Sequence, residues 1–262
     1  MPERSEVAAW RPDLPGVREV LHARFAEHAY PAHTHDAWTV LIIDSGAVRY
    51  DLDHHEHGAL TSHVTLLPPH VPHDGRNATA EGFGKRVLYL ETDVLDPGLA
   101  GAAVDSPALA DRVLRARLDQ LHRVLAPGRG GLEAESRLAL IRERLGLHLD
   151  RRATPAPAHR DPGLARRLRD LLDANTVPGV ALADASAALH AHPVHLVRAF
   201  SAEFGLPPHR YLTGRRVDLA RRLLLDGVRP AEVAAAAGFY DQSHLTRHFK
   251  RMLGVPPSRF RG

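Results

Sequence analysis

The first hundred residues carry short runs of apolar and β-branched side chains, separated by Gly, Pro, Asp and His. Runs of this length between turn-forming residues are typical of β-strands. Short strands at this spacing favour a small barrel or sandwich. The predicted strands are Val17–Phe25, Trp38–Ile43, Val48–Leu52, Val64–Leu67 and Arg86–Leu90.

The apolar period then changes to three and four residues, which is the period of an amphipathic helix. Pro107–Leu125 places Leu114, Leu118 and Leu121 on one face, and Glu133–Leu149 repeats the pattern. We therefore expect two helices after the strands.

Residues 151–163 contain three prolines and few apolar side chains, which is typical of a linker. Everything beyond this stretch predicts short helices. We expect an α+β protein with a β-barrel domain and its helices at 1–152, a linker at 153–163 and an all-α domain at 164–262.

The all-α domain contains an internal repeat. When the chain is shifted by 49 residues, eight positions within a stretch of 17 are identical, and Tyr211 then meets Phe260. The identities run from His195 to Arg210 in the first copy and from His244 to Arg259 in the second. Such agreement predicts two copies of one structural unit.

Each copy has a short Ala-rich helix, a turn and a second helix. The helices are Leu182–Leu189 and Pro193–Phe204 in the first copy, and Ala231–Ala237 and Gln242–Leu253 in the second. This arrangement describes a helix-turn-helix, whose second helix enters the major groove of DNA. A plain helical-hairpin repeat is the alternative, but two units are too few for a solenoid.

Each second helix has one apolar pair whose two members lie four residues apart and should therefore face the core together. The pairs are Leu196 with Phe200 and Leu245 with Phe249. The other positions are expected to face DNA. These DNA-binding candidates are Val194, His195, Val197, Arg198 and Ser201 in the first helix, and Gln242, Ser243, His244, Thr246, Arg247 and Lys250 in the second.

Charge is unevenly distributed along the chain. The 262 residues carry a net charge of +3, but from Asp161 onward 15 Lys and Arg face 9 Asp and Glu, a net of +6. The preceding 160 residues therefore hold a net of −3. A basic half favours a polyanionic partner such as duplex DNA, although a solvated Arg-rich helix face gives a similar count.

Composition excludes several classes of protein. The sequence has no cysteine, so disulfides and thiolate metal sites are excluded and a cytoplasmic location fits. The N-terminus has no apolar segment of the kind a signal peptide needs, and no run reaches the roughly 18 apolar residues of a membrane span. We therefore expect a cytoplasmic protein without a membrane partner.

The second copy, AEVAAAAGFYDQSHLTRHFKRMLGVPPSRFR, resembles the signature segment of the AraC/XylS family of bacterial transcription activators. LADASAALHAHPVHLVRAFSAEFGLPPHRYL resembles that family's first helix-turn-helix, and the similarity covers about residues 164–262. The resemblance implies two recognition helices in successive major grooves, with Arg198 and Arg247 reading guanine edges. Val194 and Val197 depart from the polar residues often seen there, which implies readout of thymine methyls or weaker readout. RNA polymerase is a further implied partner.

Two N-terminal segments resemble, more loosely, the motifs of a cupin barrel, a sensor domain that AraC-family regulators often carry. They are YPAHTHDAWTVLIIDSG at 30–46 and LPPHVPHDGRN at 67–77. His33 and His35 lie two residues apart, so on a strand they share one face. The resemblance adds the second motif's histidine to the same pocket. The effector-binding candidates are His33, His35, Trp38 and His73.

Metal-binding cupins take two histidines and a glutamate from the first motif and a third histidine from the second. Here Thr39 stands about where the glutamate would be. Three imidazoles remain (His33, His35 and His73), enough for Zn²⁺ or another divalent ion. His70 is a further ligand candidate, and a polar pocket without metal is the alternative. The stretch Asp53–His57 predicts a solvated hairpin tip.

Two functions from different classes fit these features. The first is a transcription regulator that binds a small effector in the barrel, forms a homodimer through the Pro107–Leu125 helix and signals through the linker. The second is a metal-dependent cupin enzyme, a dioxygenase or isomerase, fused to a DNA-binding domain. The missing glutamate and the DNA-binding half, which has no catalytic purpose, favour the regulator.

Overall fold

The computed structural model describes residues 6–26, 29–53, 55–125, 131–150, 161–253 and 255–260. The chain divides into two compact units, residues 1–130 with 137–155 and residues 131–136 with 156–262. Most of the predicted linker lies at 151–160, outside the described residues. None of the helices in the described ranges has the length and apolar character that crossing a bilayer requires.

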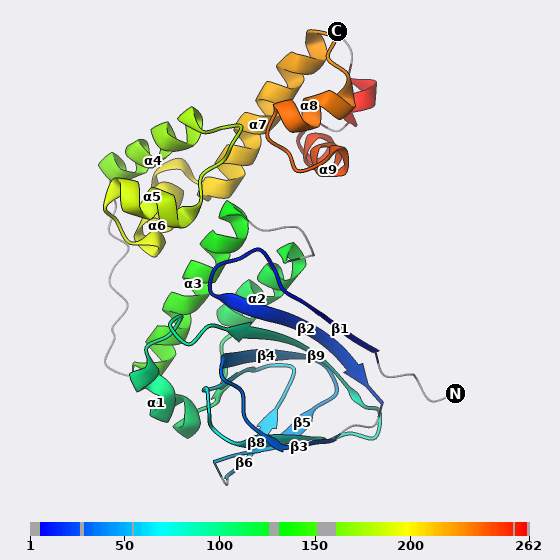
Figure 1. The fold of residues 1–262 in the computed structure, drawn as a ribbon, viewed down its shortest axis with the longest axis vertical. Helices are drawn as coiled ribbons and strands as arrows, with labels where there is room; N and C mark the ends of the chain where they lie inside the picture. The colour runs from blue at the N-terminus through cyan, green and yellow to red at the C-terminus, as the bar shows by residue number, and fades with distance from the viewer. Residues whose placement is uncertain are drawn as a thin grey trace. The chain divides into compact units, whose positions relative to one another are not determined.

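The N-terminal unit contains two antiparallel sheets that face each other (Figure 1). One sheet has the strand order β1-β2-β9-β4-β7-β10 and the other β3-β8-β5-β6. The barrel expected from the strand pattern is confirmed. The strands are β1 (Glu6–Trp10), β2 (Val17–Phe25), β3 (Ala29–His33), β4 (Trp38–Ser45), β5 (Val48–Leu52), β6 (His55–Ala59), β7 (Val64–Leu67), β8 (His73–Asn77), β9 (Phe83–Leu90) and β10 (Ala108–Leu109).

The central strands β4 and β7 of the larger sheet are apolar and buried on both faces. On β4, Thr39, Leu41 and Ile43 point between the two sheets and line a cavity. The alternate residues point to the opposite face, against which α2 (Arg112–Val124) and α3 (Leu132–Leu149) lie (Figure 1). A hydrogen bond from Arg115 Nη2 to the Ile43 carbonyl, 2.8 Å long, ties α2 to this sheet.

Helix α2 begins later than the sequence predicted, at Arg112 rather than Pro107. Residues 108–109 instead pair with β7, and Asp111 caps the helix by accepting hydrogen bonds from the backbone of Val113 and Leu114. Burial by itself would raise the pKa of Asp111, but hydrogen bonds from Arg144 and His148 hold it well below its usual range. The cap therefore also joins α2 to α3.

The apolar face of α2, the helix expected to form the homodimer, is buried within the single chain. Leu114, Leu118 and Leu121 are at most 1% exposed. Their burial against the unit's own core leaves no part of them for a second subunit. The outer face of α2 presents Val113, which is 47% exposed, among polar and small side chains.

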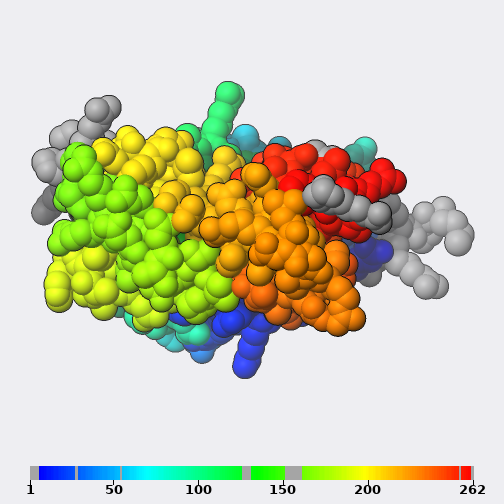
Figure 2. Space-filling model, turned by 90° about the horizontal axis from the view of Figure 1, so that it is seen from above, coloured from blue at the N-terminus to red at the C-terminus, as the bar shows by residue number. Residues whose placement is uncertain are grey.

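The C-terminal unit is helical and contains the two predicted helix-turn-helix motifs. Its two halves lie side by side along α7 (Figures 1 and 2). The predicted bounds of α5, α6 and α9 are confirmed at both ends. The helices of this unit are α4 (Pro162–Ala174), α5 (Leu182–Leu189), α6 (Pro193–Phe204), α7 (Pro208–Leu225), α8 (Pro230–Ala236) and α9 (Gln242–Leu253). A 3-10 turn, Pro257–Arg259, follows α9. The N-terminal unit has a further 3-10 turn, Pro97–Leu99, and a short helix, α1 (Ala100–Asp105).

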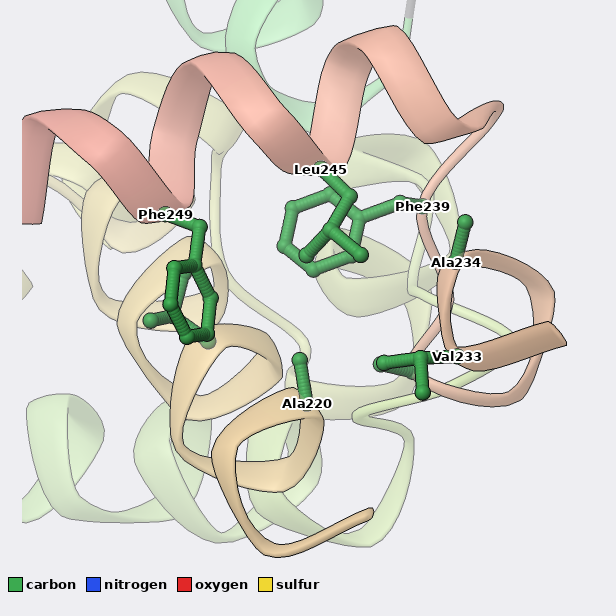
Figure 3. Close-up of a cluster of buried hydrophobic side chains, with 8 residues drawn as sticks. Ala220, Val233, Ala234, Phe239, Leu245 and Phe249 are labelled. Carbon is green, nitrogen blue, oxygen red and sulfur yellow. The ribbon is translucent and has the colours of Figure 1, made fainter. Parts of the chain in front are cut away.

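The apolar pairs of the second helices form the centre of each half. Leu196 and Phe200 of α6 and Leu245 and Phe249 of α9 are fully buried, as their spacing predicted. In the second half Leu245 and Phe249 pack with side chains from α7 and α8 (Figure 3). This packing fixes which side of each second helix is left for solvent or DNA.

The two halves touch at the turn that follows α4. Arg216 of α7 donates from Nε to the Thr176 carbonyl at 2.7 Å. Gly238, in the turn before α9, has φ +78° and lies so close to Val177 that an added Cβ would come within 2.4 Å of its carbonyl oxygen. The two halves are therefore closely packed at this turn.

Candidate functional site

Helix α9 presents a basic outer face. Ser243, Arg247 and Lys250 are exposed and follow one another at steps of four and three residues, so they form one stripe. Arg251, which the sequence reasoning missed, is exposed beside them; its spacing of four from Arg247 was the available signal. Three cations on one helical face suit a phosphate backbone and guanine edges.

The other DNA-binding candidates of α9 lie outside this stripe. Gln242 is exposed at the start of the helix and Thr246 is half-buried. The ring of His244 packs edge-on to Phe239, and its backbone N–H donates to Asp241 Oδ1 at 2.5 Å. His244 therefore packs against the preceding turn and does not belong to the outer stripe.

Two of the predicted outward residues of α6 are not outward. Val194 and Val197 are 6% and 3% exposed, so the expectation that they face DNA is wrong. They lie three residues apart and widen the apolar face of the helix beyond Leu196 and Phe200. Burial of a branched apolar side chain lowers the free energy of the folded chain by about 1.5–3 kcal/mol, which favours this orientation.

The outer face of α6 is narrow. Arg198 is half-buried and Ala202, the counterpart of Arg251, is exposed. The Ser201 hydroxyl donates to the Val197 carbonyl at 2.7 Å, which turns it back onto its own helix. His195 Nε2 lies 3.7 Å from a carboxylate oxygen of Asp161, the residue that caps α4. Among these candidates Arg198 is the side chain best suited to reading a base.

The N-terminal unit has a cavity of about 110 Å³ between its two sheets. It has room for several water molecules or one small organic molecule. The rings of His33, His35 and His73 meet there, with centroids 4.6–5.1 Å apart. His35 lies beyond the end of β3, so the loop, and not a shared strand face, brings it to His33.

Backbone carbonyls orient two of the three rings. His33 Nδ1 lies 2.7 Å from the Pro31 carbonyl and His73 Nδ1 lies 3.1 Å from the Val71 carbonyl, so each Nδ1 carries the hydrogen. Their Nε2 atoms are then acceptors. Burial, together with the neighbouring His73 and His33, lowers the pKa of His35 to about 4. Burial also lowers the pKa of His73.

The three imidazoles fit the requirements of a divalent cation in part. Their nitrogen atoms all lie within 4.8 Å of one another. Around a zinc ion they would be roughly 3.4 Å apart, so the rings would have to move closer. Two rings already have the Nδ1–H to carbonyl bond that holds metal-ligating histidines in place. Among the described residues, no carboxylate belongs to the cluster.

Other predicted residues lie away from this cavity. Trp38 is fully buried but points to the opposite face of β4, because side chains alternate along a strand and Thr39 faces the cavity. His70 is exposed and does not belong to the histidine cluster. The predicted hairpin tip at Asp53–His57 is shorter than expected, because His55–Ala59 forms β6 and the His57 ring stacks on Tyr50.

Sequence reasoning missed several residues that line the cavity. Lys85 and Tyr89 of β9 and Tyr30 of β3 contribute polar groups to it. Burial lowers the pKa of Lys85 to about 8 and raises the pKa of Tyr30 and Tyr89 to about 12. Strand β9 is covered on both faces, so its sequence has no alternation that would have separated cavity residues from the rest.

Models of known protein families match both halves of the chain. A model described as an AraC-like ligand binding domain matches residues 15–142, and one described as a helix-turn-helix domain matches residues 185–262. The first covers the barrel with its cavity and the second covers α6 and α9. The order of the two modules is that expected from the sequence.

The chain is also similar to individual proteins. The chain is 24% identical over 223 residues to the HTH-type transcriptional regulator YbfI of Bacillus subtilis, a match that covers 82% of this chain and 81% of YbfI. It is 35% identical over 63 residues to the virulence regulon transcriptional activator VirF of Yersinia enterocolitica, but that match spans only 24% of this chain and 23% of VirF. Among solved structures, the AraC-like transcriptional activator CuxR is 16% identical, with 82% of this chain and 80% of CuxR covered and a TM-score of 0.44.

Proposed function

This chain belongs to the AraC family of DNA-binding transcription regulators that respond to a small effector, and from that premise we propose how its own residues divide the work. Helix α9 supplies most of the DNA affinity and reads bases through Arg247. Helix α6 adds a second, weaker contact through Arg198. The observation that carries this proposal is the stripe of exposed cations on α9, which α6 lacks.

Each side chain of the α9 stripe has a role that follows from its chemistry. The planar guanidinium of Arg247 matches the O6 and N7 acceptors of guanine in the major groove. Lys250 and Arg251 are suited to phosphates, which add affinity but carry no base information. Ser243 and Gln242, at the start of the helix, are placed for hydrogen bonds to base edges or phosphate oxygens.

In the sensor half the effector occupies the cavity that His33, His35 and His73 share. A divalent ion such as Zn²⁺, if present, would be held by these three imidazoles and would supply a Lewis-acidic centre for an oxygen atom of the effector. A metal-dependent cupin enzyme is not favoured, because Thr39 stands in place of an acidic ligand and no turnover is needed to explain a sensor joined to a DNA-binding unit.

The proposal includes a homodimer that acts in the cytoplasm and activates transcription by contacting RNA polymerase. It divides the chain into a sensor domain at 1–152, a linker at 153–163 and a DNA-binding domain at 164–262. The linker passes the state of the sensor to the DNA-binding half.

The exposed outer face of α2 around Val113 is the proposed dimer contact. Light scattering of the full chain and of Val113→Glu tests it, because a monomeric wild-type protein at micromolar concentration contradicts the dimer.

The test of the main proposal is a genome-wide footprint of the purified full chain, followed by titration of a recovered site and of its scrambled version. We expect Arg247→Ala to weaken binding to the recovered site far more than to the scrambled one. Arg49→Ala, which removes the same charge from an exposed position on β5, is the matched control and should leave both affinities unchanged. Equal losses on both duplexes would mean that Arg247 contacts phosphate.

A further inference from the structure

One cation lies inside the barrel without an acidic partner. Lys85 follows the alternation of β9 that also sends Val87 and Tyr89 into the cavity, and it sits opposite Ile43 on β4. Its Nζ lies 4.1 Å from the centroid of the Tyr30 ring. Within the described part of the chain, Lys85 makes no ion pair.

A buried ammonium in this setting is incompletely solvated. The face of a tyrosine ring offsets part of the lost hydration, but a carboxylate or several hydrogen-bond acceptors would offset more. Burial lowers the pKa of Lys85 to about 8, so the amine is still mostly protonated at neutral pH. The cavity therefore contains a positive charge that an anionic ligand can neutralise.

The other ionisable groups of the cavity do not supply the missing negative charge. Asp74, the one carboxylate among the described residues that line it, is already engaged. Its oxygens accept hydrogen bonds from the Asp51 backbone at 2.7 Å and from Arg76 at 3.4 Å. The carboxylate of Asp74 is thus paired with groups other than Lys85.

The remaining walls are apolar and close together. Leu41, Ile43 and Val87 of the larger sheet face Val48 of the smaller sheet across the cavity. Such walls favour a compact hydrocarbon body and leave little room for a second charged group.

We propose that the effector is a small monocarboxylate with a compact apolar body, whose carboxylate pairs with Lys85 and whose body lies against Leu41, Ile43 and Val87. This inference rests on the proposed function, since it names the ligand class of the same sensor cavity. The imidazoles of His33 and His73, which line the same cavity, can hydrogen-bond a polar substituent of the ligand.

The test compares two probes of the same shape that differ in charge, cyclohexanecarboxylate and cyclohexanecarboxamide. Isothermal titration of the full chain at pH 7 should show at least ten-fold tighter binding of the carboxylate. Lys85→Met keeps an unbranched side chain of similar size and removes the charge, so it should abolish the preference. Lys85→Arg should retain it.

The control for a general effect of charge is Arg49→Met, which removes one cation from an exposed position on β5 and should leave the preference unchanged. The far-ultraviolet circular dichroism spectrum shows whether each variant is folded. If Lys85→Met does not fold, the preference for the carboxylate in the wild type and in Lys85→Arg decides the test. Equal binding of the two probes, no binding of the carboxylate at millimolar concentration, or a preference that survives in folded Lys85→Met would overturn the proposal.

Two further measurements distinguish a carboxylate bound to Lys85 from one bound to a metal ion, and distinguish failure of this proposal from failure of the proposed function. A chelator should not change the preference for the carboxylate, and loss of the preference after chelation would place the anion on a metal ion instead of Lys85. The genome-wide footprint tests the proposed function independently. Specific DNA sites together with absent carboxylate binding would overturn the ligand class alone, whereas absent DNA sites would overturn the function.

Discussion

Helices α6 and α9 occupy matching places in the repeat, yet they offer different surfaces to a partner. On α9 the exposed stripe contains Arg247, Lys250 and Arg251, and on α6 the corresponding positions are Arg198, Ser201 and Ala202. Both buried sides use a pair of apolar residues four apart, but α6 adds Val194 and Val197 to its buried side. The two copies therefore share the central apolar pair and differ at the positions around it.

The turns before the two helices differ as well. His190, with φ +48°, ends α5 in the left-handed region, where a side chain is tolerated at some cost. In the second unit Gly238 takes this role and also lies against Val177 and Arg216. The second turn is thus constrained by tertiary contact and the first by local conformation.

The largest effect is expected for Gly238→Ala. The new Cβ would meet the Val177 carbonyl oxygen at 2.4 Å in a backbone conformation with φ +78°, so we expect a loss of about 3 kcal/mol or more in the stability of the C-terminal unit. Gly205→Ala is the matched control, because Gly205 has φ +71° but no atom within 4 Å of an added Cβ, and it should cost about 1 kcal/mol. Urea unfolding of the full chain with hydrogen exchange measures both, and similar losses would show that the contact with Val177 is unimportant.

The next effect concerns the buried valines of α6. Val197→Ser places a hydroxyl at a position that is 3% exposed, and we expect it to destabilise the unit by about 2 kcal/mol. Thr246→Ser, the counterpart on α9, changes a half-buried polar residue and should cost much less. Val197→Ser with unchanged stability but altered DNA preference would mean that Val197 faces DNA after all.

The third prediction compares base reading by the two helices. Arg247→Ala should cost about 1–3 kcal/mol on a cognate site and relax preference at one base pair. Arg198→Ala should cost less, because its side chain is already half-buried on a narrow outer face. Titration of the full-length variants on cognate and single-substitution duplexes decides the order, and a larger loss for Arg198→Ala would reverse the assignment of roles.

The smallest effect is expected in the salt dependence. Lys250→Ala and Arg251→Ala should each reduce the slope of log K against log salt by about one unit, because each releases one fewer counterion. Ser201→Ala on α6 should leave the slope unchanged. The measurement is a series of affinities between roughly 50 and 200 mM salt, the range over which such slopes are resolved. An unchanged slope for either variant would contradict its phosphate contact.

The sequence predicted the elements of the C-terminal unit well because its helices are amphipathic and bounded by strong local signals. Gly205 and Pro193 mark a helix end and start, and the apolar pairs fix one buried side. The extent of that side was not predictable. Val194 and Val197 carry no polar group, so their burial depends on neighbours that only the fold supplies.

The barrel shows the same limit more strongly. Its apolar strands were found, but β3, β6 and β8 are short and polar and are stabilised by pairing with other strands. The sequence of β8, HDGRN, has the composition of a turn. Tertiary pairing overrides this local preference, because each strand's backbone groups find partners in the sheet.

By itself, then, the sequence determined the order of the elements, the duplication and the presence of three histidines in two short motifs. These features depend on spacing along the chain, which the residues carry directly. Only the tertiary structure decided that Thr39 faces the cavity while Trp38 turns away, that His35 reaches the cluster from a loop, and that Lys85 lies inside the barrel. These outcomes depend on which face of a strand is covered by a second sheet and which by a helix, and strands covered on both faces have no polar alternation that reveals the choice.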